Sequence, residues 1–371
     1  MMRAAVVAML MAAPTLSCAG APAAAGELRV LLAGQALIKH DLRVVLPDRH
    51  GAIVSLVRTG APHVAFTNLE TTISGSFGGK PTRDTEFFHA TTPAVLDCLK
   101  DIGFNLLATG NNHSWDLGAE GVLSTLAEVD ARGFIRAGSG RNLGEAAAPA
   151  FLETPAGRVA LVAFASGKLR ESGATAMRPG VNEVRLDAEQ RIVAEDLDRV
   201  RAAVRLAAAH APCVIVYQHD HYWEEDRAKT PEWKIKLARD CLDAGGTIFV
   251  SHGVPQLHGI ELHRGRPIFY GLGSFIFHSI TKPGHYAPEV WQTVLADLVI
   301  KDGRLGSIRL RPVLLNEAGF DASRFNQTRG APQPATGAAA RRVLDYLAAQ
   351  SRPHGTELTI KDDTAFVRLP Q

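Results

Sequence analysis

The sequence alternates short apolar runs rich in β-branched residues with longer amphipathic segments, and this alternation constrains the fold more than any other feature. Six runs have the length and composition of buried strands: residues 28–33, 63–70, 105–110, 158–165, 213–219 and 247–252. Segments with a helical spacing of apolar residues lie between several of them. Strand, helix and strand in this order predict sheets that are covered by helices.

The helical segments carry recognisable end signals. Thr92 and Pro93 begin a helix that ends at Gly103, in keeping with the preference of Thr and Pro for first positions and of Gly for last ones. A long apolar stripe predicts a second helix over residues 187–209, and the last helix is expected over residues 338–350.

The C-terminal part has a different pattern. Residues 267–277 and 294–315 are strand-like without an intervening helix, and a Lys-Asp-Gly turn at 301–303 predicts an antiparallel hairpin. No interdomain linker is visible. We therefore expect one domain over residues 27–316, with a loop, a helix and a tail over residues 317–371 packed on it.

Residues 1–26 have the composition of a secretion signal. Arg3 is followed by an apolar run over residues 4–16 and by small residues, and the run is too short to span a bilayer. Two routes of processing stay open, cleavage at a small residue within 21–25 or lipidation of Cys18, which would give a lipid anchor, and an uncleaved anchor is the remaining alternative. Both predict secretion across the inner membrane to the periplasm or cell envelope, without a transmembrane span in the mature chain.

Charge and cysteine content exclude several classes. The 40 Lys and Arg residues against 38 Asp and Glu residues give a net charge of +2 without a basic run, so nucleic acid is not an expected partner. Besides Cys18, the cysteines Cys98, Cys213 and Cys241 are odd in number and have no paired spacing. A disulfide framework is therefore not predicted, and we expect buried thiols.

Five of the predicted strands are followed by side chains that can bind a metal. In chain order these are Gln35, then Asn68 with Glu70, then Asn111, Asn112 and His113, then His219 with His221, and finally His252. Sites in such folds lie at the carboxyl ends of strands, and carboxylate, amide and imidazole groups bind Mn²⁺, Zn²⁺ or Fe²⁺. Each residue alone is also an ordinary loop residue, but their coincidence predicts a metal centre.

Four segments resemble bacterial capsule synthesis proteins of the CapA type, the poly-γ-glutamate biosynthesis (PGA_cap) family. They are TNLETTISG (67–75), TGNNHSWDLGAEGVLSTLAEVDARGF (109–134), VIVYQHDHYWEE (214–225) and DAGGTIFVSHGVPQLHGIELHRGRPIFYGLGSFIF (243–277). The family is similar to calcineurin-like metallophosphoesterases. The resemblance implies an α/β (α+β) fold: a four-layer metallophosphatase-like sandwich with two central mixed β-sheets flanked by helices and a two-metal site at strand ends.

The resemblance assigns the ligands of one metal to residues that are all present. They are Glu70, as the bridging carboxylate, with Asn112, His219 and His252. We therefore expect one divalent ion per chain, Mn²⁺, Zn²⁺ or Fe²⁺.

The neighbouring metal position lacks its ligands. The family pattern has Asp where this chain has Gln35, and a second His where this chain has Pro255. An amide is a weak ligand and proline has no donor atom. Substitution by His258, or by His40 with Asp41, stays open because these residues lie close in sequence to the lost ligands.

The resemblance also implies roles around the metal. His113 matches the family position of the histidine that protonates a leaving group or stabilises transition-state charge. Asn68, Asn111 and Asp116 are expected to fix loops and orient ligands. Residues that could line a polymer groove, or alternatively anchor their loops, are Trp115, His221, Tyr222 and Trp223.

Three functional interpretations follow. The first is a capsule-linked envelope protein with one metal and weak hydrolase activity toward a phosphoester or amide. The second is a non-catalytic assembly factor that binds an envelope polymer at the same site, and the third is an envelope protein without metal. An anionic or peptide-like polymer is the expected partner, and a net charge near zero means that a local basic patch would have to hold it.

Overall fold

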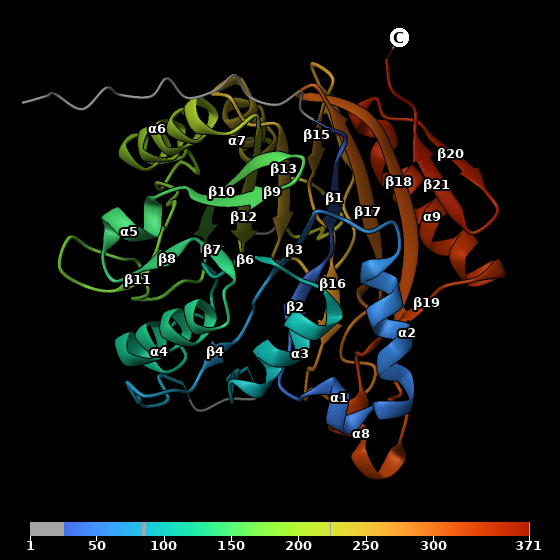
Figure 1. Cartoon of the computed structure of the whole chain (residues 1–371), viewed down its shortest axis with the longest axis horizontal. Coiled ribbons are helices and arrows are strands. Elements are labelled where there is room, and N and C mark those ends of the chain that lie inside the picture. Colours follow the sequence, from blue (N-terminus) through green and yellow to red (C-terminus); the bar gives the residue numbers. More distant parts are fainter. Residues whose placement is uncertain (1–25, 84–86, 223, 371) are drawn as a thin grey trace, which may run out of the picture.

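Two β-sheets packed face to face form the centre of the molecule in this computed structural model, which describes residues 26–83, 87–222 and 224–370 (Figure 1). The large sheet contains, in spatial order, β20 (Leu358–Lys361), β21 (Thr364–Val367), β18 (Arg304–Leu315), β17 (Gln292–Lys301), β1 (Leu28–Leu32), β3 (Val64–Asn68), β6 (Leu106–Ala108) and β7 (Ile135–Ala137), with β19 (Pro332–Pro334) beside β18. The second sheet contains β14 (Ile260–His263), β15 (Arg266–Phe269), β13 (Ile248–His252), β12 (Cys213–Asp220), β10 (Gly157–Ser166) and β9 (Ala150–Thr154).

Both sheets are mixed. Strands β1, β3, β6 and β7 run parallel, as do β10, β12 and β13, whereas β17 and β18 form the predicted antiparallel hairpin. Smaller pairs join β2 (Gln35–Leu37) to β16 (Ser274–Phe277), β4 (Thr72–Ile73) to β5 (Ala90–Thr91), and β8 (Ser139–Gly140) to β11 (Gly180–Val181).

Helices cover the two outer faces. The large sheet packs against α1 (Leu42–Val45), α2 (Pro47–Arg58) and α3 (Ala94–Ile102), and the second sheet packs against α6 (Ala194–His210) and α7 (Glu232–Asp243). Other helices of the described chain are α4 (Gly118–Ala131), α5 (Leu143–Ala147), α8 (Phe325–Thr328) and α9 (Gly337–Ser351), with short 3-10 turns at Pro288–Trp291, Ala322–Arg324 and Arg352–His354.

The two-residue period of the strands explains the layers. Leu32 and Ile215 belong to the core between the sheets, whereas their neighbours Leu31 and Val216 belong to the two outer cores under the helices. All four side chains are fully buried, so both faces of each sheet are covered. The predicted fold class, a four-layer α/β sandwich with two mixed sheets flanked by helices, is confirmed.

The helix predicted over residues 187–209 is wrong at its start, because α6 begins only at Ala194. The Asp187 carboxylate accepts the backbone N–H of Arg191, and Gln190 has a φ of +58°, which is incompatible with a helix. A side chain that accepts backbone hydrogen bonds stabilises a turn in place of the first helical turn.

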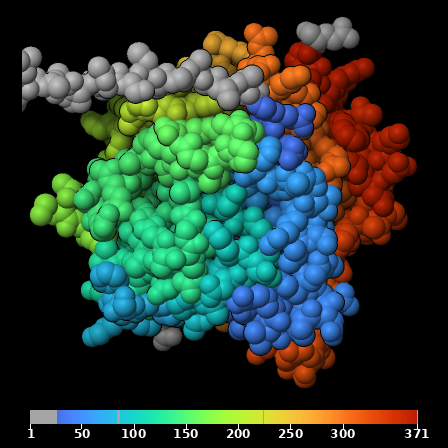
Figure 2. All heavy atoms as spheres, in the orientation of Figure 1, coloured from blue at the N-terminus to red at the C-terminus, as the bar shows by residue number. Residues whose placement is uncertain are grey.

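The C-terminal segment contributes to the same core. Val343, Leu344 and Leu347 of α9 and Val367 of β21 join the cluster between the sheets, and β20 and β21 extend the large sheet. The sequence predicts a plain tail there, so it missed this hairpin. In the space-filling view the segment (red) lies along one side of the molecule (Figure 2).

The predicted signal over residues 1–26 and its Cys18 lie outside the described residues, apart from Gly26. Within the described part of the chain, no helix is both long and apolar enough to cross a membrane.

Replacing Leu344 by Ala tests whether α9 is part of the core. Because Leu344 is fully buried in the central cluster, we expect the free energy of unfolding to fall by about 2 to 5 kcal/mol in chemical denaturation. Arg342→Ala, on the exposed face of the same helix, should change it by less than about 0.5 kcal/mol. Equal effects of the two variants would contradict a core role for α9.

Candidate metal centre and basic cavity

The parallel strands of both sheets bring their carboxyl ends to a common region. Asn68 ends β3, and His252 ends β13. His219 of β12 is the direct ladder partner of His252. Polar residues that are far apart in the chain therefore meet where the two sheets adjoin.

Three side chains offer metal ligand atoms that lie within 4.8 Å of one another: Glu70, His219 and His221. Nε2 of His219 lies 3.5 Å from Oε1 of Glu70 and 2.8 Å from Oδ1 of Asn112, so the amide borders the same group. The structure thus brings together three of the four predicted ligands, Glu70, Asn112 and His219, and adds His221.

The chemistry of this group fits a divalent cation. Oε2 of Glu70 is buried and has no hydrogen-bond partner among the described residues, and burial raises the pKa of this carboxyl well above its usual range, with Asp116 adding to the effect. Burial also lowers the pKa of His219 well below its usual value, followed by the effect of His221. Neutral imidazoles beside an unsatisfied carboxylate oxygen form a donor set suited to a divalent ion.

His252 has a different environment from the one predicted. Its ring lies 5.3 Å from that of Tyr217 and 6.4 Å from that of Phe66, and it is not part of the three-residue group. Both ring nitrogens are buried without a hydrogen-bond partner in the described chain, and burial lowers the pKa to about 3. Its role as a ligand stays a prediction.

His221, which the sequence placed both among the possible strand-end ligands and along a groove, belongs to the ligand group and also lines the cavity. It follows His219 by two residues at the end of an extended strand, and side chains two apart in a strand point to the same face. This spacing is the reason why the sequence could list His221 with His219 among the possible ligands, although the four-ligand set from the family resemblance does not include it.

Asp116 is a buried carboxylate that holds three cationic or imidazole side chains. Its Oδ2 accepts the Nδ1–H of His113 at 2.9 Å, and its Oδ1 lies 2.9 Å from Nε of Arg83 and 3.0 Å from an amino group of Arg170. Because this contact uses Nδ1 of His113, the other ring nitrogen, Nε2, can interact with a group in the cavity that His113 lines. Burial, with Arg83 next, lowers the pKa of His113 well below its usual value.

The asparagines hold the adjoining loop. Nδ2 of Asn111 donates to Oδ1 of Asn68 at 3.1 Å and to the Leu69 carbonyl at 2.7 Å, while Oδ1 of Asn111 accepts the N–H of His113 at 3.0 Å. Nδ2 of Asn68 lies 3.4 Å from Nδ1 of His219. These contacts link the loop after β6 to the histidine of β12.

The neighbouring metal position does not fit an ion. Oε1 of Gln35 accepts the N–H of Gly253 at 3.1 Å, and its Nε2 donates to Oγ of Ser274 at 3.4 Å, so both ends of the amide are engaged. Gly253 has a φ of +115°, and a Cβ there would collide with the Asp220 carbonyl. Pro255 lines the cavity wall without a donor atom.

The substitute ligands considered from the sequence are engaged elsewhere. Nε2 of His258 donates to the Arg227 carbonyl at 2.8 Å. The Asp41 carboxylate caps α1 and pairs with Arg43 at 2.7 Å, and the ring of His40 lies 5.5 Å from that of His278. None of them belongs to a group of ligand atoms within the described residues.

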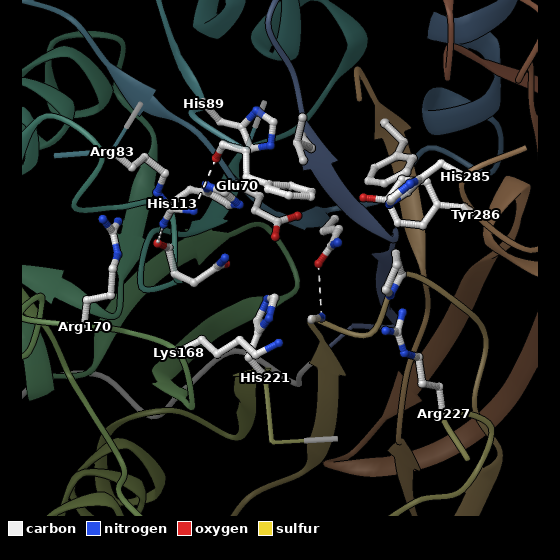
Figure 3. A pocket seen from close by; sticks show the side chains of 17 residues that line it. Glu70, Arg83, His89, His113, Lys168, Arg170, His221, Arg227, His285 and Tyr286 are labelled. Carbon is white, nitrogen blue, oxygen red and sulfur yellow. Dashed lines mark hydrogen bonds between the residues drawn. The ribbon is translucent and has the colours of Figure 1, made fainter. Parts of the chain in front are cut away.

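A cavity of about 600 Å³ opens over the ligand group (Figure 3). Four cationic side chains line it, and Glu70 is the one carboxylate among its described lining residues. The cationic residues are Arg83, Lys168, Arg170 and Arg227. The local basic patch that a polymer with negative charge would require is therefore present, although the net charge of the chain is small.

The aromatic residues proposed for the groove lie elsewhere. Trp115 packs with Val122 and Leu126, and the ring of Tyr222 lies 6.0 Å from that of Trp233. Neither is among the described residues that line the cavity, and Trp223 lies outside the described residues. Phe87, Phe277 and Tyr286 supply the aromatic part of the wall.

Comparison with known proteins gives consistent matches. The family model "Bacterial capsule synthesis protein PGA_cap" matches residues 29–279. The chain is 29% identical to the uncharacterized protein y4sH of Sinorhizobium fredii, over 85% of this chain and 88% of that protein. It is 30% identical to the PGA biosynthesis protein CapA of Bacillus subtilis, over 63% of this chain and 57% of CapA. The sulfate thiohydrolase SoxB of Thermus thermophilus in complex with glycerol has a TM-score of 0.42 and 13% identity, covering 91% of this chain and 62% of SoxB.

The buried histidines predict a loss of stability in mild acid. Burial lowers the pKa of both His258 and His278 from 6.5 to about 3, so below pH 6.5 the unfolded chain takes up protons that the folded chain does not. Stability is therefore fully present above pH 6.5 and falls toward pH 3, by about 1.4 kcal/mol per pH unit for each histidine. The raised pKa values of Glu70, Asp116, Glu183 and Asp220 act in the opposite direction, whereas the lowered pKa values of further histidines, among them His113, His219 and His252, act in the same direction.

Urea denaturation at about pH 7.5 and about pH 5 measures this loss. The variant His278→Gln removes one of the buried imidazoles, so its loss between the two pH values should be smaller than that of the unmodified chain. An equal midpoint at both pH values would contradict the prediction.

Proposed function

This chain belongs to the bacterial capsule synthesis protein PGA_cap family, and from that premise we propose that it serves capsule or poly-γ-glutamate synthesis in the cell envelope, with one metal ion and weak hydrolase activity. The observation that carries the proposal is the unsatisfied Glu70 oxygen beside the buried imidazole of His219 and the half-buried imidazole of His221 at the floor of a basic cavity.

Glu70, His219 and His221 would hold the ion, with Asn112 as a further oxygen donor. Mn²⁺, Zn²⁺ and Fe²⁺ all accept carboxylate and imidazole ligands. When bound, such an ion supplies Lewis-acid polarisation of an ester or amide oxygen.

The proton-transferring group is His113. The Asp116 carboxylate accepts its Nδ1–H and so fixes the tautomer and the ring orientation, which leaves Nε2 to exchange a proton with the leaving group. Arg83 and Arg170 share the same carboxylate and line the cavity. Their partly neutralised charge is suited to binding the oxygens of an anionic substrate.

The proposed partner is an anionic or peptide-like envelope polymer. Support comes from the excess of cationic side chains around the cavity and from its mixed wall, in which Tyr286 and Phe87 offer apolar surface beside them. A periplasmic or envelope location, with either a cleaved signal or a lipid anchor at Cys18, belongs to the same proposal.

A second candidate is a non-catalytic assembly factor that binds the polymer at this site. The observation that favours it is the engagement of Gln35 with Gly253 and Ser274 at the neighbouring position, since a site with one ion stabilises less transition-state charge than a site with two.

Metal analysis of protein purified without chelators tests the ion. We expect about one divalent ion per chain by elemental mass spectrometry, and a loss of affinity of at least about tenfold for His219→Ala and for Glu70→Gln, because each removes a donor atom. His210→Ala, at the exposed end of α6, is the control and should keep the metal. Less than about 0.2 ion per chain would contradict the proposal.

Hydrolysis of a generic aryl phosphodiester tests catalysis. We expect slow turnover, and for His113→Ala a fall in kcat of about 100-fold or more without a change in metal content, because the proton donor is lost. Asp116→Asn should lower kcat and shift its pH profile, because the imidazole loses the acceptor that sets its tautomer. Absence of turnover by the metal-loaded, unmodified protein would support the assembly factor instead, and wild-type turnover in both variants would contradict the role of His113.

A further inference from the structure

Among the described residues, neither Gln35 nor Pro255 offers a ligand atom for a second ion. The Gln35 amide is occupied at both ends by Gly253 and Ser274, and Pro255 offers no donor. His258 directs its Nε2 to a backbone carbonyl. A ligand oxygen that entered this part of the cavity would therefore meet no metal charge.

A protein cation lies in this region. Arg227 lines the same cavity as Gln35 and Pro255. In Figure 3 it lies with His285 and Tyr286 on one side of Glu70, whereas Arg83, His113 and Arg170 lie on the other.

The backbone of Arg227 is held in place from the core. Nε2 of His258 donates to the Arg227 carbonyl at 2.8 Å, and His258 itself is only 2% exposed. Burial lowers the pKa of His258 to about 3, so the imidazole is neutral and its one proton is committed to this bond. A buried side chain thus anchors the exposed loop that carries the guanidinium.

We propose that Arg227 supplies the fixed positive charge for an oxyanion-binding subsite bordered by Gln35 and Pro255, in place of a second metal ion. A guanidinium presents parallel N–H donors to two oxygens of a carboxylate or phosphate group and stays charged at any physiological pH. The guanidinium carries one positive charge, whereas a divalent ion carries two. We therefore expect this subsite to bind and orient an anionic group, with little activation of that group for reaction.

The subsite gives the cavity two regions for anionic groups. One contains Arg83 and Arg170 beside His113, and the other contains Arg227. A ligand with oxyanions at intervals, such as a polymer of acidic units, can occupy both at once. This inference rests on the proposed role of the cavity in binding an anionic polymer, and it names the residue that selects for the negative charge.

Isothermal titration with inorganic phosphate, on metal-free and on Mn²⁺-loaded full-length protein, tests the subsite. Arg227→Gln should weaken phosphate binding by about 10-fold or more in both forms, and Arg227→Lys should weaken it less, because the charge remains. Arg205→Gln, the control, removes a charge from the exposed face of α6, and the phosphate affinity of this variant should equal that of the unmodified protein. A γ-linked diglutamate probe in the same titrations shows whether carboxylates use the subsite as phosphate does.

The outcomes separate this inference from the proposed function. A protein that binds no metal but still depends on Arg227 for phosphate keeps the subsite and loses the metal proposal. A protein that binds one Mn²⁺ normally, and in which Arg227→Gln and Arg205→Gln have equal phosphate affinity, overturns the subsite and keeps the metal. Because Arg227 is exposed, its replacement should leave the fold intact, which circular dichroism verifies.

Discussion

Burial of apolar side chains between two sheets is the constraint on which the site depends. Strands β3, β6, β12 and β13 bury residues on both faces, so their register is determined by the side chains of three cores. Their carboxyl ends are therefore held rigidly next to one another. The polar residues that follow these strands form a site because the packed strands cannot move apart.

The same burial determines the electrostatics. The imidazoles of His113 and His219 are buried and that of His221 is half-buried, and burial lowers the pKa of all three, which favours the neutral form suited to bind a metal or to transfer a proton. Arg83 and Arg170 compensate the charge of the buried Asp116 carboxylate, and their ion pairs with Asp116 hold both side chains at the edge of the cavity. The proposed cation site at the floor and the proposed anion sites at the wall thus rest on one arrangement of charges.

Sequence reasoning predicted which strand ends carry the site residues better than it predicted the individual contacts there. The strand ends at Glu70, Asn112 and His219 converge as expected, because parallel strands share an edge. The predicted start of the helix at residue 187 was wrong because a local hydrogen bond of the Asp187 side chain competes with the first helical turn. The place of His252 depends on the rings of Phe66 and Tyr217, which come from different sheets. Contacts of this kind are decided by packing, which spacing does not encode.

By itself, the sequence determined the family, the alternation of strands and helices, and the weak or absent metal-donor atoms of Gln35 and Pro255, because these are properties of residue identity and order. Only the tertiary structure decided that His221 joins the ligand group and that four cationic side chains surround one cavity in a chain of nearly balanced charge. The physical reason is that charge and ligand geometry depend on distances through space. Those distances are set by the packing of the two sheets.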